Sequence, residues 1–382
     1  MNVKQLFIVL FSLFIILGCS EDKPKKDSIK SIIINYDSKR INLSDVIEKI
    51  TYIPLETTSE CLMGTINKMI YYESKFYLLD SYNAKALFIF NKDGKFIQKI
   101  LATGKGPGEF QVPSDFIIYK INRTIQILDN GLRKILLYNL HGKYISTKRY
   151  DFFADSFGLI DNNHYCFTTG NIYSPKFDGQ LIIADSLLSF IKNYLPIQKA
   201  FRNFSYGKQL KLRNINRGLY FFPNFENTIY KVNTDGIDPY LIIDFGKYQL
   251  PINFRSREMN RGEKIKYLER ANISYDIDNF CETKKFIFFN FNYKKQNFVN
   301  FYSKQSKNIR GGYQTVNGIN YMPLGRNFTT IGSKLASVID PNLVIQIKNS
   351  LPIQYRSKLP TFVKGLNDLS NQIIAIYDIK EF

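Results

Sequence analysis

Short hydrophobic runs separated by polar turns recur along the chain and follow one pattern twice in succession. The first copy covers residues 76–100 and reads "FYLLDSYNAKALFIFNKDGKFIQKI". The second covers residues 125–149 and reads "IQILDNGLRKILLYNLHGKYISTKR". Asp80 of the first copy corresponds to Asp129 of the second, and the offset between the copies is 48 to 49 residues. The pattern indicates an internal structural repeat.

Each copy predicts a set of β-hairpins. Apolar runs such as "KFYLLD" and "ALFIFN" have the length of strands, and the turns Asp93-Gly94 and His141-Gly142 precede a further strand. Glycine in such a turn supplies the positive φ that a tight hairpin requires. A repeat of about 48 residues with about four strands is typical of a β-propeller blade.

Weaker copies of the pattern continue through the chain. They cover 179–197, 227–246, 284–310 and 317–339. Together the copies fill the range from 50 to 340, which gives about six blades. The sequence therefore predicts an all-β fold, a six-bladed β-propeller of four-stranded antiparallel blades. We expect the propeller over 45–382 and either or both of the strands 52–56 and 372–379 in its final blade, since an open edge would be left otherwise.

The glycine-rich stretch "GKGPGEF" joins the last strand of one copy to the first strand of the next. A P-loop needs Ser or Thr after its Gly-Lys pair, but Lys105 is followed by Gly106. A dinucleotide-binding loop needs a further glycine after Gly108, but Glu109 and Phe110 follow. The stretch is therefore predicted to connect two blades.

A segment from 253 to 272 breaks the strand pattern and has apolar residues at roughly helical spacing. We predict a short helical insertion between the fourth and fifth blades, and two interpretations of it stay open: a solvated capping helix, or a lid or basic contact surface. The basic residues of that possible surface are Arg255, Arg257, Arg261, Lys264, Lys266 and Arg270.

The N-terminus carries an apolar run that ends in Ile16-Leu17-Gly18-Cys19. This ending resembles the lipobox of bacterial lipoproteins, which implies a signal peptide over 1–18 and a lipid anchor on Cys19. Polar residues follow, so we expect a flexible tether over 19–44. The implied location is the cell envelope, anchored to the outer membrane on its surface or periplasmic face.

Charge and composition limit the classes of partner and chemistry. The net charge of +19 is spread over all 382 residues and the pI is about 9.5, which favours compositional drift over a nucleic-acid site. Two histidines cannot supply a three-histidine zinc site. The cysteines at 61, 166 and 281 show no metal or redox spacing and are expected to be buried. We expect no catalytic residue, metal or cofactor, no nucleic-acid partner, and a monomer.

Two resemblances follow from the motifs. The run Gly104, Gly106, Gly108, Phe110 and Pro113, followed by a strand, resembles the NHL-type repeat. With "YIPLETTSECLMGTINKM", "FPNFENTIYKV" and "IIDFGKYQLP", it resembles the six-bladed β-propeller lipoproteins of glycan-degrading, anaerobic diderm bacteria. The family's Asp-Asn-Pro element before the last strand is replaced here by "LSNQIIAIYDI".

The resulting expectation is a lipid-anchored, non-catalytic binding scaffold for a glycan, peptide or envelope protein. The alternative is a propeller lyase or hydrolase that acts on an acidic polysaccharide, with the positive charge concentrating its substrate. Carboxylate pairs, or a Tyr with a Lys or Arg, converging in the central funnel would favour the enzyme. A funnel lined by apolar and amide groups would favour the scaffold.

Overall fold

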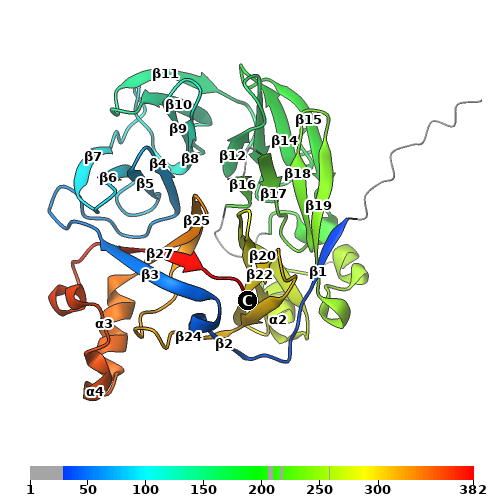
Figure 1. The fold of residues 1–382 in the computed structure, drawn as a ribbon. Coiled ribbons are helices and arrows are strands. Elements are labelled where there is room, and N and C mark those ends of the chain that lie inside the picture. The colour runs from blue at the N-terminus through cyan, green and yellow to red at the C-terminus, as the bar shows by residue number, and fades with distance from the viewer. Residues whose placement is uncertain (1–28, 205–209, 216–217, 258) are drawn as a thin grey trace, which may run out of the picture. The chain divides into compact units, whose positions relative to one another are not determined.

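The computed structural model describes residues 29–204, 210–215, 218–257 and 259–382. The predicted signal peptide, Cys19 and the part of the predicted tether over 19–28 lie outside the described residues. The chain divides into residues 1–30 and residues 31–382, and the fold is that of the second unit. Six antiparallel four-stranded blades, one of them extended by a fifth strand, form a β-propeller (Figure 1), which confirms the predicted fold class.

The first three blades follow one another along the chain in simple up-and-down order. Blade 1 consists of β4 (Lys68–Tyr72), β5 (Lys75–Asp80), β6 (Ala86–Asn91) and β7 (Phe96–Ile100). Blade 2 consists of β8 (Pro113–Tyr119), β9 (Thr124–Asp129), β10 (Lys134–Asn139) and β11 (Tyr144–Arg149). Blade 3 consists of β12 (Ser156–Leu159), β13 (His164–Thr168), β14 (Gly179–Asp185) and β15 (Phe190–Pro196).

The other three blades carry the additions to the basic pattern. Blade 4 consists of β16 (Leu212–Ile215), β17 (Gly218–Phe221), β18 (Thr228–Val232) and β19 (Ile237–Asp244), with β1 (Lys30–Ile33) beside β19. Blade 5 consists of β20 (Ser274–Glu282), β21 (Phe286–Tyr293), β22 (Gln296–Ser303) and β23 (Ile309–Gly312). Blade 6 consists of β25 (Arg326–Ile331), β26 (Lys334–Ile339), β27 (Ile373–Ile379) and β3 (Ile47–Pro54).

The burial of each strand explains its sequence pattern. The middle strands β5 and β6 are apolar almost throughout, because both faces of a blade pack against neighbouring blades. The outer strand β7 alternates between exposed and half-buried positions, as a strand at the edge of a blade does. The hydrophobic core therefore lies between the blades, and its clusters join strands of adjacent sheets.

The predicted blade connector packs closely against its own side chains. The carboxylate of Glu109 accepts a hydrogen bond of 2.8 Å from the backbone N–H of Gly106, and a Cβ on Gly104 would lie 2.0 Å from that carboxylate. The carbonyl of Gly108 accepts a 2.6 Å hydrogen bond from the Tyr138 hydroxyl. The N–H of Gly106 is thus already used inside the loop, and the loop joins β7 to β8 as the sequence predicts.

Gly108 is the position in this connector where a side chain costs most. Its φ is +73°, and a Cβ there would lie 2.9 Å from Cγ of Tyr144. We expect Gly108→Ala to lower the free energy of unfolding by about 1–3 kcal/mol, because strain and overlap add. Urea denaturation measures the loss. The control is Gly318→Ala, whose added Cβ meets nothing within 4 Å; equal stability of the two variants would contradict the prediction.

Both chain ends contribute strands to blade 6, so the expected closure is confirmed. The last strand, β27, pairs with β26 on one side and with β3 on the other, and Figure 1 shows β27 (red) beside β3 (blue). The N-terminal strand therefore supplies the outer edge of the blade and the C-terminal strand its third position. Each edge that the closure requires is covered by strand pairing.

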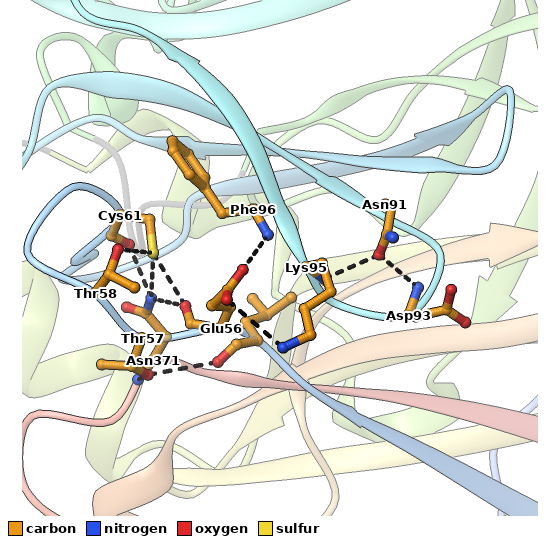
Figure 2. Close-up of polar contacts among 10 residues, drawn as sticks. Glu56, Thr57, Thr58, Cys61, Asn91, Asp93, Lys95, Phe96 and Asn371 are labelled. Atoms are coloured by element: carbon orange, nitrogen blue, oxygen red, sulfur yellow. Dashed lines mark hydrogen bonds and ion pairs between the residues drawn. The ribbon is translucent and has the colours of Figure 1, made fainter.

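The polar contacts that secure this closure are drawn in Figure 2. The side chain of Asn371 donates to the carbonyls of Glu56 (2.7 Å) and Cys61 (2.8 Å), and its backbone N–H donates to Thr57 Oγ1 (2.9 Å). Glu56 in turn accepts a hydrogen bond from the N–H of Phe96 in blade 1 (2.8 Å). Asn371 thus ties blade 6 to the approach to blade 1.

Residues 31–44 differ from the flexible tether that the sequence predicts. β1 joins blade 4, and the N–H of Ile34 donates to the carbonyl of Asp244 over 3.0 Å. β2 (Arg40–Asn42) pairs in parallel with β24 (Gln314–Val316). The side chains of Ile32, Ile34, Ile41 and Leu43 are buried, and this burial explains why the segment packs on the propeller.

Helices interrupt the strand pattern in two main places. The predicted insertion between blades 4 and 5 is confirmed: α2 (Arg261–Arg270) begins with a capping box between Asn260 and Glu263. A second insertion, which the sequence analysis missed, separates β26 from β27 and contains α3 (Pro341–Ser350) and α4 (Ile353–Arg356). The short 3-10 helices are η1 (Leu43–Asp45), η2 (Lys199–Phe201), η3 (Gly246–Tyr248), η4 (Ile252–Ser256) and η5 (Thr361–Gly365).

Candidate functional site

A cavity of about 640 Å³ lies where the first strands of the blades meet. This volume is in the range of small-ligand sites. Its wall comes from β4, β8, β12, β16 and β25, together with the residues that flank them. Aliphatic side chains dominate it, and they include Ile70, Ile117, Leu159, Ile215 and Ile331. Amides and cations also line it, namely Asn67, Asn214, Asn327, Lys68, Lys120 and Arg213. Its aromatic and hydroxyl members are Tyr71, Tyr119, Phe328, Thr329 and Thr330.

No carboxylate belongs to the wall formed by the described residues; the acidic side chains of this region lie behind it. Asp115, on β8, is fully buried and lies 2.7 Å from Lys68 Nζ of blade 1. Its second oxygen accepts hydrogen bonds from the hydroxyl of Ser156 (2.7 Å) and the N–H of Phe157 (3.0 Å) in blade 3. One carboxylate therefore connects three consecutive blades next to the cavity.

A second buried ionic group joins blades 4 and 5. The ammonium of Lys211 lies 2.7 Å from Asp276 and 3.6 Å from Asp278, and it also donates to the carbonyl of Ile277 over 2.9 Å. Burial raises the pKa of Asp276 to about 6, although the attraction of Lys211 opposes the shift. Burial alone would lower the pKa of Lys211, but the two carboxylates raise it. Electrostatic attraction therefore holds Lys211, Asp276 and Asp278 together in the buried interior.

β-Bulges in the inner strands β20 and β25 orient the polar side chains near the cavity. The pairing of β20 shifts register on both sides of Asp278, and Asp276 and Asn279 have φ values of 60° and 50°. β25 has a similar irregularity. Its pairing with β26 shifts register between Arg326 and Thr329, and Asn327, inside this shift, has a φ of 52°. Positive φ at non-glycine residues is costly and is found where the surrounding structure enforces it, often at functional sites.

Arg213 crosses from blade 4 to blade 6 at this end of the cavity. Its guanidinium donates to the carbonyl of Phe328, and to the Asn279 side chain over 3.4 Å. Asn279 also accepts a 3.2 Å hydrogen bond from the N–H of Phe328. Asn327, the neighbouring residue, donates to the carbonyl of Ile66 in the approach to blade 1. β25 is thus linked by hydrogen bonds to Arg213 of blade 4 and to the approach to blade 1, and Lys68 and Arg213 both line the cavity.

Asp155, just before β12, is the other acidic group of this region. Burial raises its pKa to about 6, and the charge of Asp115 adds to the shift. The hydroxyl of Thr168 donates to the carboxylate and opposes the shift. The folded state therefore holds the proton on Asp155 more tightly than the unfolded chain does.

We expect the charge of Asp155 to lower stability as the pH rises. The stability that its raised pKa contributes is complete below about pH 4 and is lost as the pH passes through about 6. Asparagine at this position carries no charge, so the Asp155→Asn variant does not lose stability in this way. The free energy of unfolding of the variant minus that of the natural protein should therefore increase by on the order of 1–2 kcal/mol from pH 4 to pH 8. Urea denaturation across this pH range tests it, with the exposed Asp93→Asn as control. A constant difference across the range would contradict the prediction.

The structure separates the six basic residues that were predicted to form a contact surface. Arg257, Lys266 and Arg270 line a shallow groove beside Tyr267. Lys264 differs from the expectation: it is buried, its ammonium lies 5.3 Å from the centre of the Phe204 ring, and burial lowers its pKa. Arg261 is exposed and also lies over Phe204. Arg255 belongs to η4, and its side chain is not among those described.

The remaining candidate groups of the sequence are structural where the chain is described. All three described cysteines are free and buried, as predicted. In the described part of the chain, no three His, Cys, Asp or Glu side chains are grouped to hold a metal ion. Helices long and apolar enough to span a bilayer are absent from the same residues.

A six-bladed β-propeller with a cavity at its axis is thus the class of protein that the fold defines. The chain belongs to the family described as a domain of unknown function, DUF4934, whose model matches residues 30–378. No curated protein matches the sequence. Among solved structures, a Bacteroides fragilis protein assigned as exported is similar, with 20% identity and a TM-score of 0.77, over 93% of this chain and 100% of that one.

A member of the DUF4221 family from Bacteroides vulgatus is similar at 13% identity, with a TM-score of 0.52. That match covers 88% of this chain and 98% of the other. At these identities the two solved structures show the fold, and the residues of the cavity must be judged from this chain alone.

Proposed function

We propose that the protein is a non-catalytic binding scaffold of the cell envelope that holds its ligand in the axial cavity. The observation that carries the proposal is the composition of the wall, which offers mainly aliphatic surface with amides and cations, while the nearby Asp115 and Asp276 are buried in ion pairs. Tyr71 and Tyr119 share this wall with the cations, which is the feature that favours the enzyme alternative, and a measurement of product formation decides between the two. Such a wall suits binding, because a few polar groups fix a ligand against apolar surface. Carboxylates held in ion pairs do not face a ligand as acid and base.

The location is part of the same proposal. The similar Bacteroides fragilis protein is assigned as exported, and the Leu17-Gly18-Cys19 sequence of this chain has the features of a lipoprotein signal. We propose that Cys19 carries the lipid and anchors the propeller at the outer membrane, and that the blades are of the NHL type. Labelling with a radioactive fatty acid, with Cys19→Ser as the unlabelled control, tests the anchor.

The groove beside α2 is proposed as an accessory contact of this scaffold. Arg257, Lys266 and Arg270 are exposed there, and the guanidinium of Arg257 lies 5.6 Å from the centre of the Tyr267 ring. Glu263 also lines the groove and partly offsets the positive charge. Replacement of the three basic residues by Gln should weaken the capture of an acidic ligand and leave the axial cavity unchanged.

The experiment for the axial site is a binding screen with a blocked variant. Purified protein is tested against a glycan array and a set of envelope-derived peptides, with product formation measured in parallel. Thr329→Trp places a large ring on the cavity wall and should reduce the binding of any true ligand at least about tenfold. Thr51→Trp, on the exposed face of the outer strand β3, is the matched control. Turnover of a bound ligand would overturn the non-catalytic assignment and favour the lyase or hydrolase.

A further inference from the structure

Three cationic side chains line the axial cavity, namely Lys68, Lys120 and Arg213. Some of their hydrogen-bond donors and charge remain available to a ligand. The carboxylate of Asp115 accepts four hydrogen bonds, from Lys68, Ser156 and the N–H groups of Phe116 and Phe157. Among the described residues, Lys68 has this one hydrogen-bond partner, while an ammonium has three N–H donors. Donors of Lys68 thus remain for a group inside the cavity.

Arg213 is paired with neutral acceptors. It donates to a backbone carbonyl, to the amide of Asn279 and, more weakly, to the thiol of Cys281. Arg213 lies close enough to Asp278 to oppose the rise of that carboxylate's pKa. Among the described residues, however, no carboxylate forms an ion pair with the Arg213 guanidinium within 4 Å. The charge of Arg213 is therefore available to an anionic group that enters the cavity.

The rest of the wall indicates what that anionic group is attached to. Aliphatic side chains from β4, β8, β16 and β25 form most of the apolar wall. Two of its three aromatic members pack on other rings: Tyr71 on Phe76 at 4.8 Å between centres, and Phe328 on Phe288 at 4.3 Å. The third, Tyr119, donates its hydroxyl to Asn162 over 2.5 Å. Aliphatic members outnumber the aromatic ones, so the wall suits aliphatic side chains better than sugars.

Amide groups on the same wall match the chemistry of a peptide backbone. Asn67, Asn214 and Asn327 offer both donors and acceptors, as peptide groups do. Recognition of a C-terminal carboxylate together with apolar side chains is an established way of binding peptides. We propose that the cavity receives the C-terminal end of a peptide with aliphatic side chains, and that Lys68 and Arg213 hold its free carboxylate. This inference rests on the proposed binding function.

The test uses two matched pools of N-acetylated tripeptides built from Leu, Val, Ala and Phe. One pool carries free C-terminal carboxylates and the other carries C-terminal amides. Full-length protein purified in detergent is equilibrated with both pools, and bound peptides are quantified by mass spectrometry. We expect the carboxylate pool to be retained at least about tenfold more than the amide pool, and this preference should shrink as salt rises from about 50 to about 500 mM.

Variants assign the preference to the cavity. Arg213→Gln should reduce it about tenfold, while Arg149→Gln, at an exposed position of the outer strand β11, should leave it unchanged. Because Lys68 is needed by the buried Asp115, its role is tested with the double change Lys68→Met and Asp115→Asn, after circular dichroism has shown that this variant is folded. A folded double variant that keeps the full preference for carboxylates would contradict the role of Lys68.

The outcomes separate this inference from the proposed function. Equal retention of both pools, abolished by Thr329→Trp, would overturn the carboxylate assignment and keep the cavity as a binding site. Retention of uronic-acid oligosaccharides with neither peptide pool bound would overturn the peptide class. Absence of binding by both pools and by every member of the wider screen would overturn the inference and the proposed function together.

Discussion

Removal of residues 370–382 should abolish the folded state at ambient temperature. The deletion takes away β27, whose side chains Ile373, Ile374 and Ala375 are fully buried and whose backbone pairs with both β26 and β3. Each of the two buried isoleucine side chains contributes about 2–5 kcal/mol, and the whole protein is expected to have a stability of about 5–15 kcal/mol. Thermal unfolding followed by circular dichroism is the measurement.

The matched control for this deletion removes only Glu381 and Phe382. These residues contact Ser303 and Ser306 but add no strand to blade 6. We expect the shorter deletion to lower the melting temperature by only a few degrees, about the effect of 1 kcal/mol. A thirteen-residue deletion that melts like the natural protein would show that β3 and β26 can close the propeller without β27.

Asp115→Ala should be the most damaging single substitution near the cavity. It removes the acceptor that Lys68, Ser156 and the N–H of Phe157 share, so three blades lose a common contact and buried donors are left without a partner. Loss of one member of a buried ion pair costs about 3–5 kcal/mol. Urea denaturation should show this as a lower midpoint with an unchanged slope.

Two further variants make the Asp115 prediction specific. Asp93→Ala removes an exposed carboxylate from a hairpin turn and should change stability by about 0.5 kcal/mol or less. Adding Lys68→Met to Asp115→Ala should restore part of the lost stability, because the ammonium of Lys68, left without its carboxylate, is then removed as well. Strictly additive losses in the double variant would show that the two side chains are not coupled.

The propeller was predictable because its determinants are local. The Asp-Gly and His-Gly turns and the conserved spacing of Asp80 and Asp129 define a hairpin pattern within about 48 residues. Both aspartates prove to be buried acceptors for backbone N–H groups near the end of a strand, such as those of Gly64 for Asp80 and Gln111 for Asp129. The two aspartates thus have the same structural role in blades 1 and 2, and this shared role explains why Asp recurs at this position of the repeat.

The axial cavity could not be predicted in the same way, because its residues come from first strands that lie far apart in the sequence. A signal did exist: Asp276 and Asp278 alternate with Tyr275 and Ile277 in "SYDIDNF", a strand-like stretch that is buried throughout, where an unpaired charge would be costly. Their partner Lys211 is 65 positions from Asp276, and only the geometry of the ring brings the two together. The register shifts around Asp278 also depend on the tertiary fold.

The second helical insertion was missed although its start is marked. Asp340 accepts a hydrogen bond from the N–H of Asn342, and Pro341 occupies the first turn of α3. These are ordinary signals for the beginning of a helix. The sixth copy of the repeat covers 317–339. The repeat pattern therefore indicates the strand 372–379 only as a means of closure, and it does not indicate the helices before β27.

The sharing of blade 6 between both chain ends has a consequence for biosynthesis. Thr57 and Asn371, which meet at the junction, are 314 positions apart in the sequence. β3 is made before any complete blade, yet its neighbour β27 is the last described strand to be made, so every growing chain carries an unsatisfied edge until β27 appears. Ring closure is therefore the step with the highest contact order, and a chain stalled during synthesis is an open array of blades exposed to proteases and aggregation.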